Sequence, residues 1–255
     1  MRVVLAYGFP GFVKVDVGEA QIEYFKGVAE DLRANFPDLE VIQPKVDALG
    51  DVATRAKQMA QFIPLTGELV HIIAHSAGGL DARYLVSPDR DLKLASRVRS
   101  ITTISTPHQG TVIADIVAGL IPEAAEVVSQ LKEFADGVRG LTRREMKDFN
   151  RDTPDSGDVA YFSYAGEANQ FDRGILGSIF SFSFPIVSAL EGPNDGWVSV
   201  RSAKRKIFKR KIHADHAEEV GHDLSPIGAF LDLVGDAPFD HKEFYRGIVA
   251  DLRKL

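Results

Sequence analysis

The hydrophobic positions of this chain form short β-like runs separated by longer amphipathic stretches. The short runs are bounded by turn residues and predict strands at residues 2–7, 39–42, 68–74, 99–104 and 207–212. Between them, apolar residues recur three or four positions apart and predict helices over residues 22–36 and 51–62. This alternation predicts an α/β fold with a mostly parallel central sheet and helices on both faces.

The strand predicted at residues 68–74 leads directly into Ser76, which lies among small residues. A nucleophilic serine on a sharp strand-to-helix turn requires small residues two positions before it and two positions after it. Ala74 and Gly78 meet this requirement, and parallel sheets carry their sites at the carboxyl ends of strands. We interpret Ser76 as a candidate nucleophile; the alternative is an ordinary turn with a helix-capping serine.

A serine nucleophile needs a base and an acid that orients the base, and in α/β-hydrolases the acid and then the histidine follow the serine in the chain. Asp195 lies in a turn-rich segment, and His216 follows the strand predicted at residues 207–212. His216 would take the proton of Ser76, and Asp195 would hold its imidazole in the useful tautomer. Taken alone, each is also consistent with a turn aspartate or a solvated loop histidine.

Two backbone N–H groups are needed to stabilise the oxyanion of an ester-cleaving serine. One comes from the residue after the nucleophile, here Ala77, and the other from the loop after an early strand. We assign the second donor to Phe9, because the next residue, Pro10, has no N–H.

The middle of the chain carries more apolar helical sequence than a crossover between strands requires. Two amphipathic stretches lie between residues 111 and 140, and a second apolar segment covers residues 174–190. We expect one domain over residues 1–255, with a helical lid inserted at about 111–150 and with 174–190 as a further cover. The expected acyl-binding residues are Ile116, Leu120, Phe182 and Phe184. The alternative is that these segments are ordinary helices packed on the sheet.

Composition narrows the classes of protein that this chain can represent. A net charge of -6 and a pI near 5.7 argue against a nucleic-acid partner. The basic cluster at residues 201–211 favours a solvated helix end and edge strand over a phosphate-binding patch. Cysteine is absent, so disulfides are excluded. The apolar run at residues 1–7 is too short for a signal peptide, and the one at 174–190 is too short for a membrane-spanning helix. Neither the localisation nor the oligomeric state follows from the sequence.

Several segments, in their order along the chain, resemble motifs of the bacterial true lipases of the Pseudomonas and Burkholderia type. They are Tyr7-Gly8-Phe9-Pro10-Gly11-Phe12, His75-Ser76-Ala77-Gly78-Gly79-Leu80-Asp81-Ala82-Arg83-Tyr84, Thr106-Pro107-His108-Gln109-Gly110, Asn194-Asp195-Gly196-Trp197-Val198 and His216-Ala217-Glu218-Glu219-Val220. The resemblance implies an α/β-hydrolase fold and hydrolysis of lipid acyl esters, at a lipid–water interface, through an acyl-enzyme. It also implies the triad of Ser76, Asp195 and His216.

The chain departs from these lipases in ways that bear on the site. Tyr7 replaces a histidine before the first loop, the first small residue of the elbow is Ala74 instead of glycine, and the cysteine pair of some members is absent. The ester hydrolysis that the resemblance implies requires no cofactor.

The resemblance also implies a structural Ca²⁺ ion near the histidine loop. Its ligands would be the carboxylates of Asp172 and Glu218 and the backbone carbonyls of His222 and Pro226. Glu218 stands where the family has aspartate, so its extra methylene moves the oxygens. The alternative for Glu218 is a surface carboxylate on a capping loop.

Other functions remain open on the same residues. A short-chain carboxylesterase or a thioesterase would use the same triad. A metallohydrolase site at His213, Asp215 and His216 would need a further histidine at position 211, which is lysine. A non-catalytic binding protein on this fold would leave the complete set of triad residues unexplained.

Overall fold

The computed structural model describes residues 1–255 apart from 10–13, 18–19, 122–134, 173–174, 176–179 and 225–238. Its main sheet is parallel throughout and has the strand order β4-β1-β5-β6-β7-β8. These strands are β1 (Arg2–Ala6), β4 (Glu40–Ile42), β5 (Val70–His75), β6 (Val98–Ile104), β7 (Ala160–Gly166) and β8 (Ile207–Ile212). The expected mostly parallel sheet is therefore confirmed.

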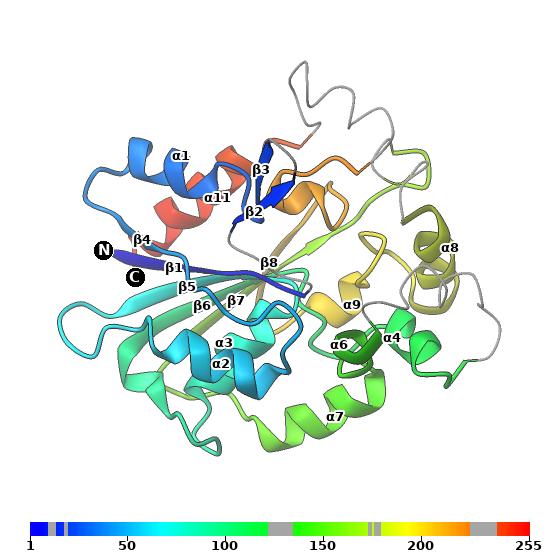
Figure 1. Ribbon diagram of the computed structural model, residues 1–255, viewed down its shortest axis with the longest axis horizontal. Helices are drawn as coiled ribbons and strands as arrows, with labels where there is room; N and C mark the ends of the chain where they lie inside the picture. The colour runs from blue at the N-terminus through cyan, green and yellow to red at the C-terminus, as the bar shows by residue number, and fades with distance from the viewer. Residues whose placement is uncertain (10–13, 18–19, 122–134, 173–174, 176–179, 225–238) are drawn as a thin grey trace.

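Helices cover both faces of this sheet (Figure 1). One face carries α1 (Val28–Asn35) and α11 (His241–Leu252), and the other carries α2 (Val52–Ala60) and α3 (Gly78–Val86). The remaining elements are α4 (Val112–Val117), α6 (Ala135–Arg139), α7 (Arg143–Asp152), α8 (Phe180–Glu191), α9 (Val200–Ala203) and the 3₁₀ turns η1 (Leu94–Arg97) and η3 (Glu218–Val220). Figure 1 shows α4, α6, α8 and α9 gathered at the carboxyl end of the strands.

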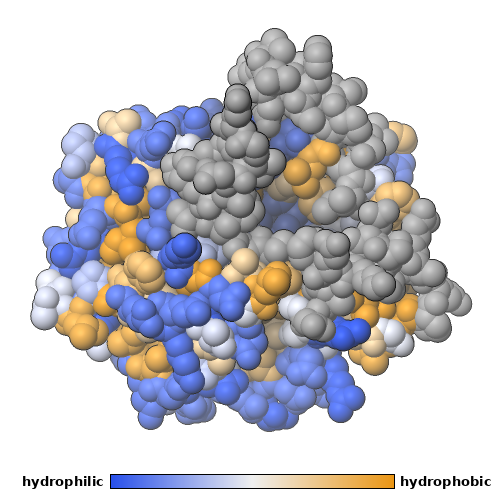
Figure 2. All heavy atoms as spheres, viewed as in Figure 1, coloured by the Kyte–Doolittle hydropathy of each residue, from blue (hydrophilic) through white to orange (hydrophobic). Residues whose placement is uncertain are grey.

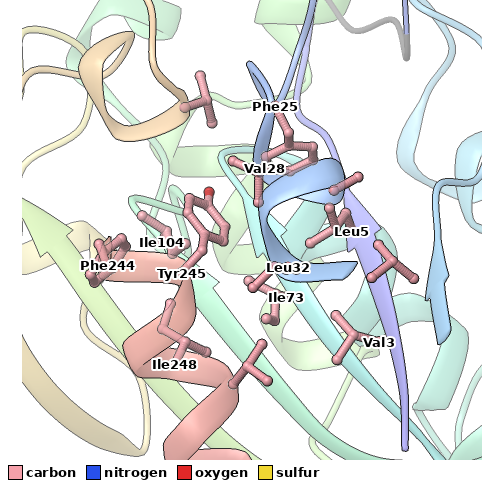
Figure 3. Close-up of a cluster of buried hydrophobic side chains, with 14 of the residues drawn as sticks. Val3, Leu5, Phe25, Val28, Leu32, Ile73, Ile104, Phe244, Tyr245 and Ile248 are labelled. Carbon is pink, nitrogen blue, oxygen red and sulfur yellow. The ribbon is translucent and has the colours of Figure 1, made fainter. Parts of the chain in front are cut away.

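The inner strands β1 and β5 are buried on both faces because both faces of the sheet are covered, whereas the edge strand β8 is mostly exposed. Leu5 packs with Leu32 of α1 and Tyr245 of α11, all fully buried, in the cluster drawn in Figure 3. Val4 directly precedes Leu5 in β1 and points to the other face of the sheet, where it packs in a cluster that contains Met59 of α2. This alternation explains why the strands read in the sequence as nearly continuous apolar runs.

The helix predicted at residues 22–36 begins later than its apolar spacing suggests. Ile22 belongs to a strand, β3 (Ala20–Glu23), which pairs with β2 (Lys14–Val17) in a small antiparallel sheet. Gly27 adopts a left-handed φ of 64° and starts α1. Apolar spacing identifies the buried face of α1, here Ala29 and Leu32, but it does not mark where the helix begins.

The predicted lid segment at 111–150 contains α4, α6 and α7, and residues 122–134 lie outside the described residues. The second cover segment, 174–190, contains most of α8, whereas residues 174 and 176–179 lie outside the described part of the chain. None of the described helices combines the length and the apolarity needed to cross a membrane. The lid and cover roles stay predictions.

Gly78 is the position at which the packing of α3 on β1 leaves no space for a side chain. A Cβ there would lie 2.5 Å from the carbonyl oxygen of Ala6 and 2.7 Å from that of Tyr7. We therefore expect Gly78→Ala to lower the free energy of unfolding by roughly 1–3 kcal/mol in urea titrations. The control is Gly247→Ala in α11, where a Cβ meets nothing within 4 Å and the change should stabilise by about 0.5–1 kcal/mol. Equal stability of the two variants would contradict this account.

Candidate active site

Ser76 lies at the sharp turn between β5 and α3. Its φ is 54°, in the left-handed region that residues other than glycine rarely adopt. Its N–H donates to the carbonyl of Ile104 at 2.9 Å, and its own carbonyl accepts from Thr106 Oγ1 at 2.7 Å. Ala74 is fully buried in the core, which accommodates its methyl group. The neighbouring strand therefore holds the turn in its strained form.

The structure brings the three predicted triad residues into one hydrogen-bonded chain. Ser76 Oγ lies 3.0 Å from His216 Nε2, and His216 Nδ1 lies 2.8 Å from Asp195 Oδ2. The other carboxylate oxygen of Asp195 accepts from the N–H groups of Trp197 and Val198, at 2.8 and 2.7 Å. With Nδ1–H donating to the carboxylate, Nε2 is left to accept from the serine hydroxyl.

The loop after β1 approaches the serine closely. A Cβ on Gly8 would lie 2.4 Å from Ser76 Cβ, so only glycine permits this contact. Phe9 and Ala77, the expected oxyanion donors, line the same pocket of about 260 Å³. Ser76, Asp195 and His216 do not line this pocket, so it adjoins the serine only through Phe9 and Ala77, and the oxyanion role of these two residues stays a prediction.

Arg55 holds the Gly8 loop from beneath. Its Nη2 donates to the carbonyls of Tyr7 and Gly8 at 2.6 and 3.3 Å, and its Nε to Asp81 Oδ2 at 2.9 Å. The Arg55 and Asp81 side chains are both 2% exposed. They therefore form a buried ion pair in which Arg55 also holds the carbonyls of Tyr7 and Gly8. The Tyr7 hydroxyl donates to the carbonyl of Val46 and accepts from its N–H, both at 2.7 Å, which anchors the loop where the family carries histidine.

Behind the triad lies a second, fully buried polar network. His75 Nε2 lies 2.9 Å from Glu219 Oε2, and His75 Nδ1 lies 2.8 Å from the hydroxyl of Tyr24. Glu219 Oε1 accepts from Ser105 Oγ at 2.6 Å, and the same oxygen of Ser105 accepts from the N–H of Gly166 at 2.9 Å. This network connects β5, β7 and η3 with the residues that directly follow β3 and β6.

Burial shifts the pKa values of His75 and Glu219 in this second network toward their neutral forms. It lowers the pKa of His75 well below its ordinary value, and the neighbouring His216 adds to the shift. Burial also raises the pKa of the Glu219 carboxyl well above its ordinary value, with the charge of Asp195 acting in the same direction. The rings of His75 and His216 are 4.5 Å apart, so a neutral His75 places no charge against His216.

Sequence reasoning missed Arg55, Asp81, Tyr24 and Glu219 as parts of the site. A signal was present for some of them. Asp81 and Glu219 fall inside the matched lipase motifs, and ionisable residues in otherwise apolar stretches must find partners when they are buried. Arg55 and Tyr24 carried no such signal, because their partners lie far away in the chain.

The expected acyl-binding residues occupy unlike environments. Ile116 is buried in a cluster that includes Ala77 and Val187, so α4 and α8 meet beside the serine. Leu120 and Phe182 are 56% and 38% exposed. The buried Phe184 packs with Ile175, Phe180 and Ala217, in the manner of a core residue.

The two expected calcium carboxylates lie near one another. Burial raises the pKa of Glu218, and the charges of Asp223 and Asp172 raise it further. Glu218 Oε2 accepts from the N–H of Asp215, while the ring of His222 contacts the carbonyls of Glu23 and Tyr24. Pro226 lies outside the described residues. Carboxylate oxygens are the hard donors that a divalent cation such as Ca²⁺ prefers, so calcium stays a proposal carried by Asp172 and Glu218.

The residues of the metallohydrolase alternative do not gather into a donor set in the described part of the chain. The group of ionisable side chains that could hold a metal there is His75, His216 and Glu219, all of which already have hydrogen-bond partners. His213 is 73% exposed and lies 3.4 Å from Asp172. Asp215 Oδ1 instead accepts from the backbone N–H groups of Ala217 and Glu218.

Comparison with known proteins identifies lipases as relatives. The chain is 34% identical over 212 aligned positions to triacylglycerol lipase 2 of Saccharomyces cerevisiae, covering 76% of this chain and 62% of the length of the yeast protein. A triacylglycerol lipase of Vibrio cholerae is 26% identical over 266 aligned positions, covering 86% of this chain and 78% of that protein. No protein-family model matches the chain.

Solved structures show the same fold. The crystal structure of Staphylococcus hyicus lipase matches 99% of this chain and 95% of its own, with a TM-score of 0.71 at 19% identity. At this identity the match shows the fold alone. The expected α/β-hydrolase fold is thereby confirmed.

If Asp172 and Glu218 hold Ca²⁺, chelation should destabilise the folded protein. Mass action predicts a melting temperature lower by roughly 5–10 °C in EDTA than at a calcium concentration of about 100 times Kd. Calcium added in excess should restore the melt, as followed by circular dichroism. Glu218→Gln should remove most of the calcium-dependent change. An identical melt of the wild type in EDTA and in calcium would overturn the calcium proposal.

Proposed function

Because this chain belongs to the lipase branch of the α/β-hydrolase superfamily, we propose that it is a serine ester hydrolase that acts on acylglycerols or related acyl esters. The observation that carries the proposal is the chain of hydrogen bonds from Ser76 through His216 to the buried Asp195. An activated serine requires this order of nucleophile, base and orienting acid.

In the acylation step, Ser76 Oγ attacks the carbonyl carbon of the ester while its proton passes to His216 Nε2. The carbonyl oxygen becomes an oxyanion, which the N–H groups of Phe9 and Ala77 stabilise. His216 then gives its proton to the leaving alcohol, and the acyl group stays on Ser76.

In the deacylation step, a water molecule takes the place of the alcohol. His216 accepts a proton from this water while the water oxygen attacks the acyl carbon. The proton then passes from His216 to Ser76 Oγ as the carboxylic acid leaves. Asp195 stabilises the imidazolium in both steps without taking the proton. Its two bonds from backbone N–H groups hold the carboxylate in position against His216.

The buried groups around the triad act as supports. Arg55 holds the carbonyls of Tyr7 and Gly8, which fixes the direction of the next N–H, that of Phe9. α6 packs directly on this residue, since a Cβ on Gly137 would lie 2.0 Å from the Phe9 ring. Displacement of α6 would therefore act directly on the oxyanion loop, which supports a lid role for the segment at 111–150.

Exposed apolar side chains support a lipid substrate and contact with a lipid–water interface. Leu120, Phe182 and Leu190 are 56%, 38% and 54% exposed. Figure 2 shows hydrophobic atoms on the side of the molecule where Figure 1 places α4 and α8. Such residues at the entrance to the site suit an acyl chain or a lipid surface.

One observation favours a short-chain carboxylesterase or thioesterase as the second candidate. The pocket beside Phe9 and Ala77 has a volume of about 260 Å³ and is partly lined by Asp51, Arg55 and Asp81. Ionisable residues at the pocket wall disfavour a long acyl chain in that direction.

Replacing the serine tests the proposal directly. We expect Ser76→Ala to abolish hydrolysis of p-nitrophenyl butyrate and labelling by a fluorophosphonate, because the nucleophile is removed. The melting temperature should change little, since only a hydroxyl is lost. A Ser76→Ala/His216→Ala double variant should be no slower than Ser76→Ala, because triad members act as a unit. Residual turnover by purified Ser76→Ala near the wild-type rate would refute the assignment.

The substrate class is tested by chain length. If Phe182 contacts the acyl chain, Phe182→Ala should lower kcat/KM for a ten-carbon ester more than for acetate, because burial contributes about 0.8 kcal/mol per methylene. Leu65→Ala is the control, since Leu65 is 73% exposed and lies in the loop before β5, at the amino end of the sheet. Equal losses on both esters would identify a short-chain esterase in a lipase-like frame.

A further inference from the structure

A second hollow, away from the triad, lies between α7 and α9. Its volume is about 480 Å³, and the Gln109–Gly110 turn forms part of its wall. One helix contributes Arg143, Lys147 and Asn150, which are spaced to share a helix face. The other side contributes Ser199, Arg201, Ser202 and Arg205. None of Ser76, Asp195 and His216 lines it, so this hollow is separate from the candidate active site.

Positive charge dominates the lining of this hollow. It carries Arg143, Lys147, Arg201 and Arg205 against one carboxylate, Glu191, in a chain whose net charge is -6. Arg143 is paired with Asp115, and Arg205 with Asp155.

Lys147 and Arg201 form no ion pair with any residue that the structure describes. Both side chains are exposed to solvent, and they line one open hollow from different elements. A small anion in the hollow would pair with both.

Glu191 calls for a hydrogen-bond donor on the ligand, whereas the two cations call for an anion. Its side chain is 1% exposed, and its Oε1 accepts from the N–H of Val112 at 3.0 Å. Its Oε2 is buried without a hydrogen-bond partner in the described structure. Buried carboxylate oxygens are normally paired, so a donor group on a ligand in this hollow would complete the site.

We propose that this hollow binds a small phosphorylated alcohol or amine. Its phosphate lies against Lys147 and Arg201, where charge-assisted hydrogen bonds are strongest. Its hydroxyl or ammonium group donates to Glu191 Oε2. The same chemistry occurs in a free glycerophosphate-like compound and in a phospholipid headgroup. Neither simple anions nor simple cations satisfy both parts of the lining.

The hollow is connected to the loop that carries Asp195. Ser202 Oγ donates to the carbonyl of Gly110 at 2.6 Å, and Thr111 Oγ1 donates to that of Trp197 at 2.7 Å. The N–H of Trp197 in turn donates to Asp195 Oδ1. A ligand that bridges α7 and α9 would therefore stabilise the segment that positions the triad acid.

The test compares two double variants of equal charge. Lys147→Gln/Arg201→Gln removes the two unpaired cations of the hollow. Arg144→Gln/Lys204→Gln is the matched control, because it removes two cations at neighbouring positions that do not line the hollow. Inorganic phosphate and sn-glycerol 3-phosphate are titrated calorimetrically into each protein at constant ionic strength.

We expect glycerol 3-phosphate to bind the wild type and the control with similar Kd, and the Lys147→Gln/Arg201→Gln variant at least roughly tenfold more weakly. Glu191→Gln should reduce the preference for glycerol 3-phosphate over inorganic phosphate, since the acceptor for the hydroxyl is weakened. Hydrolysis of p-nitrophenyl acetate without phosphate verifies that each variant is folded.

Co-sedimentation with vesicles separates the two sources of the phosphate. Binding to phosphatidylglycerol vesicles that is lost only in the Lys147→Gln/Arg201→Gln variant would assign a lipid headgroup. Binding of free glycerol 3-phosphate without vesicle binding would assign a soluble ligand. The proposal is overturned if neither probe binds the wild type saturably, or if the control loses binding as much as the variant.

Discussion

The left-handed backbone of Ser76 is the constraint on which the candidate site depends. A non-glycine residue at a φ of 54° is unfavourable by itself and persists only where its surroundings prescribe it. Here Gly8 on one side and the bond from Ser76 N–H to Ile104 on the other leave the turn little freedom. The same turn places the serine hydroxyl within 3.0 Å of His216. The sheet thus offsets the backbone strain at Ser76, and the strained turn presents the serine hydroxyl to His216.

Polar groups buried around this turn are costly to hide, and their pairing shapes the site. Arg55 and Asp81 compensate each other's charge while Arg55 also holds two backbone carbonyls. Burial instead shifts the pKa values of His75 and Glu219 toward their neutral forms. The Arg55–Asp81 pair fixes the loop after β1, and the His75–Glu219 pair braces the turn at Ser76. Removing one partner of such a pair would leave the other buried and unsatisfied.

The carboxyl end of the sheet collects elements with different surface chemistry. α4 and α8 meet beside Ala77, and apolar side chains are exposed at Leu120, which follows α4, and at Phe182 and Leu190 of α8. α7 and α9 instead enclose a basic hollow around one buried carboxylate. Hydrogen bonds connect both regions to the loop of Asp195: Thr111 at the start of α4 donates to the carbonyl of Trp197, and Ser202 of α9 donates to that of Gly110, next to Thr111. A lipid ester at the triad and a phosphorylated ligand in the hollow would therefore act on adjoining parts of one frame.

Local pattern in the sequence determined much of the architecture. Apolar runs of strand length, helical spacing between them and a serine between Ala74 and Gly78 are local features, and they sufficed for five of the six parallel strands and for the sharp turn at Ser76. The strand β7 was not predicted. The start of α1 was not predictable either, because apolar spacing does not mark where a helix begins.

Only the tertiary structure decided which distant side chains meet. His75 and Glu219 are 144 positions apart, and Arg55 and Asp81 are 26 apart, so no local pattern couples them. The basic segment at 201–211 forms the helix end and the exposed edge strand β8 that the sequence favoured, but only the folded chain places Arg201 opposite α7. Burial and pairing of charge are properties of the folded chain, because they depend on which elements the sheet brings together.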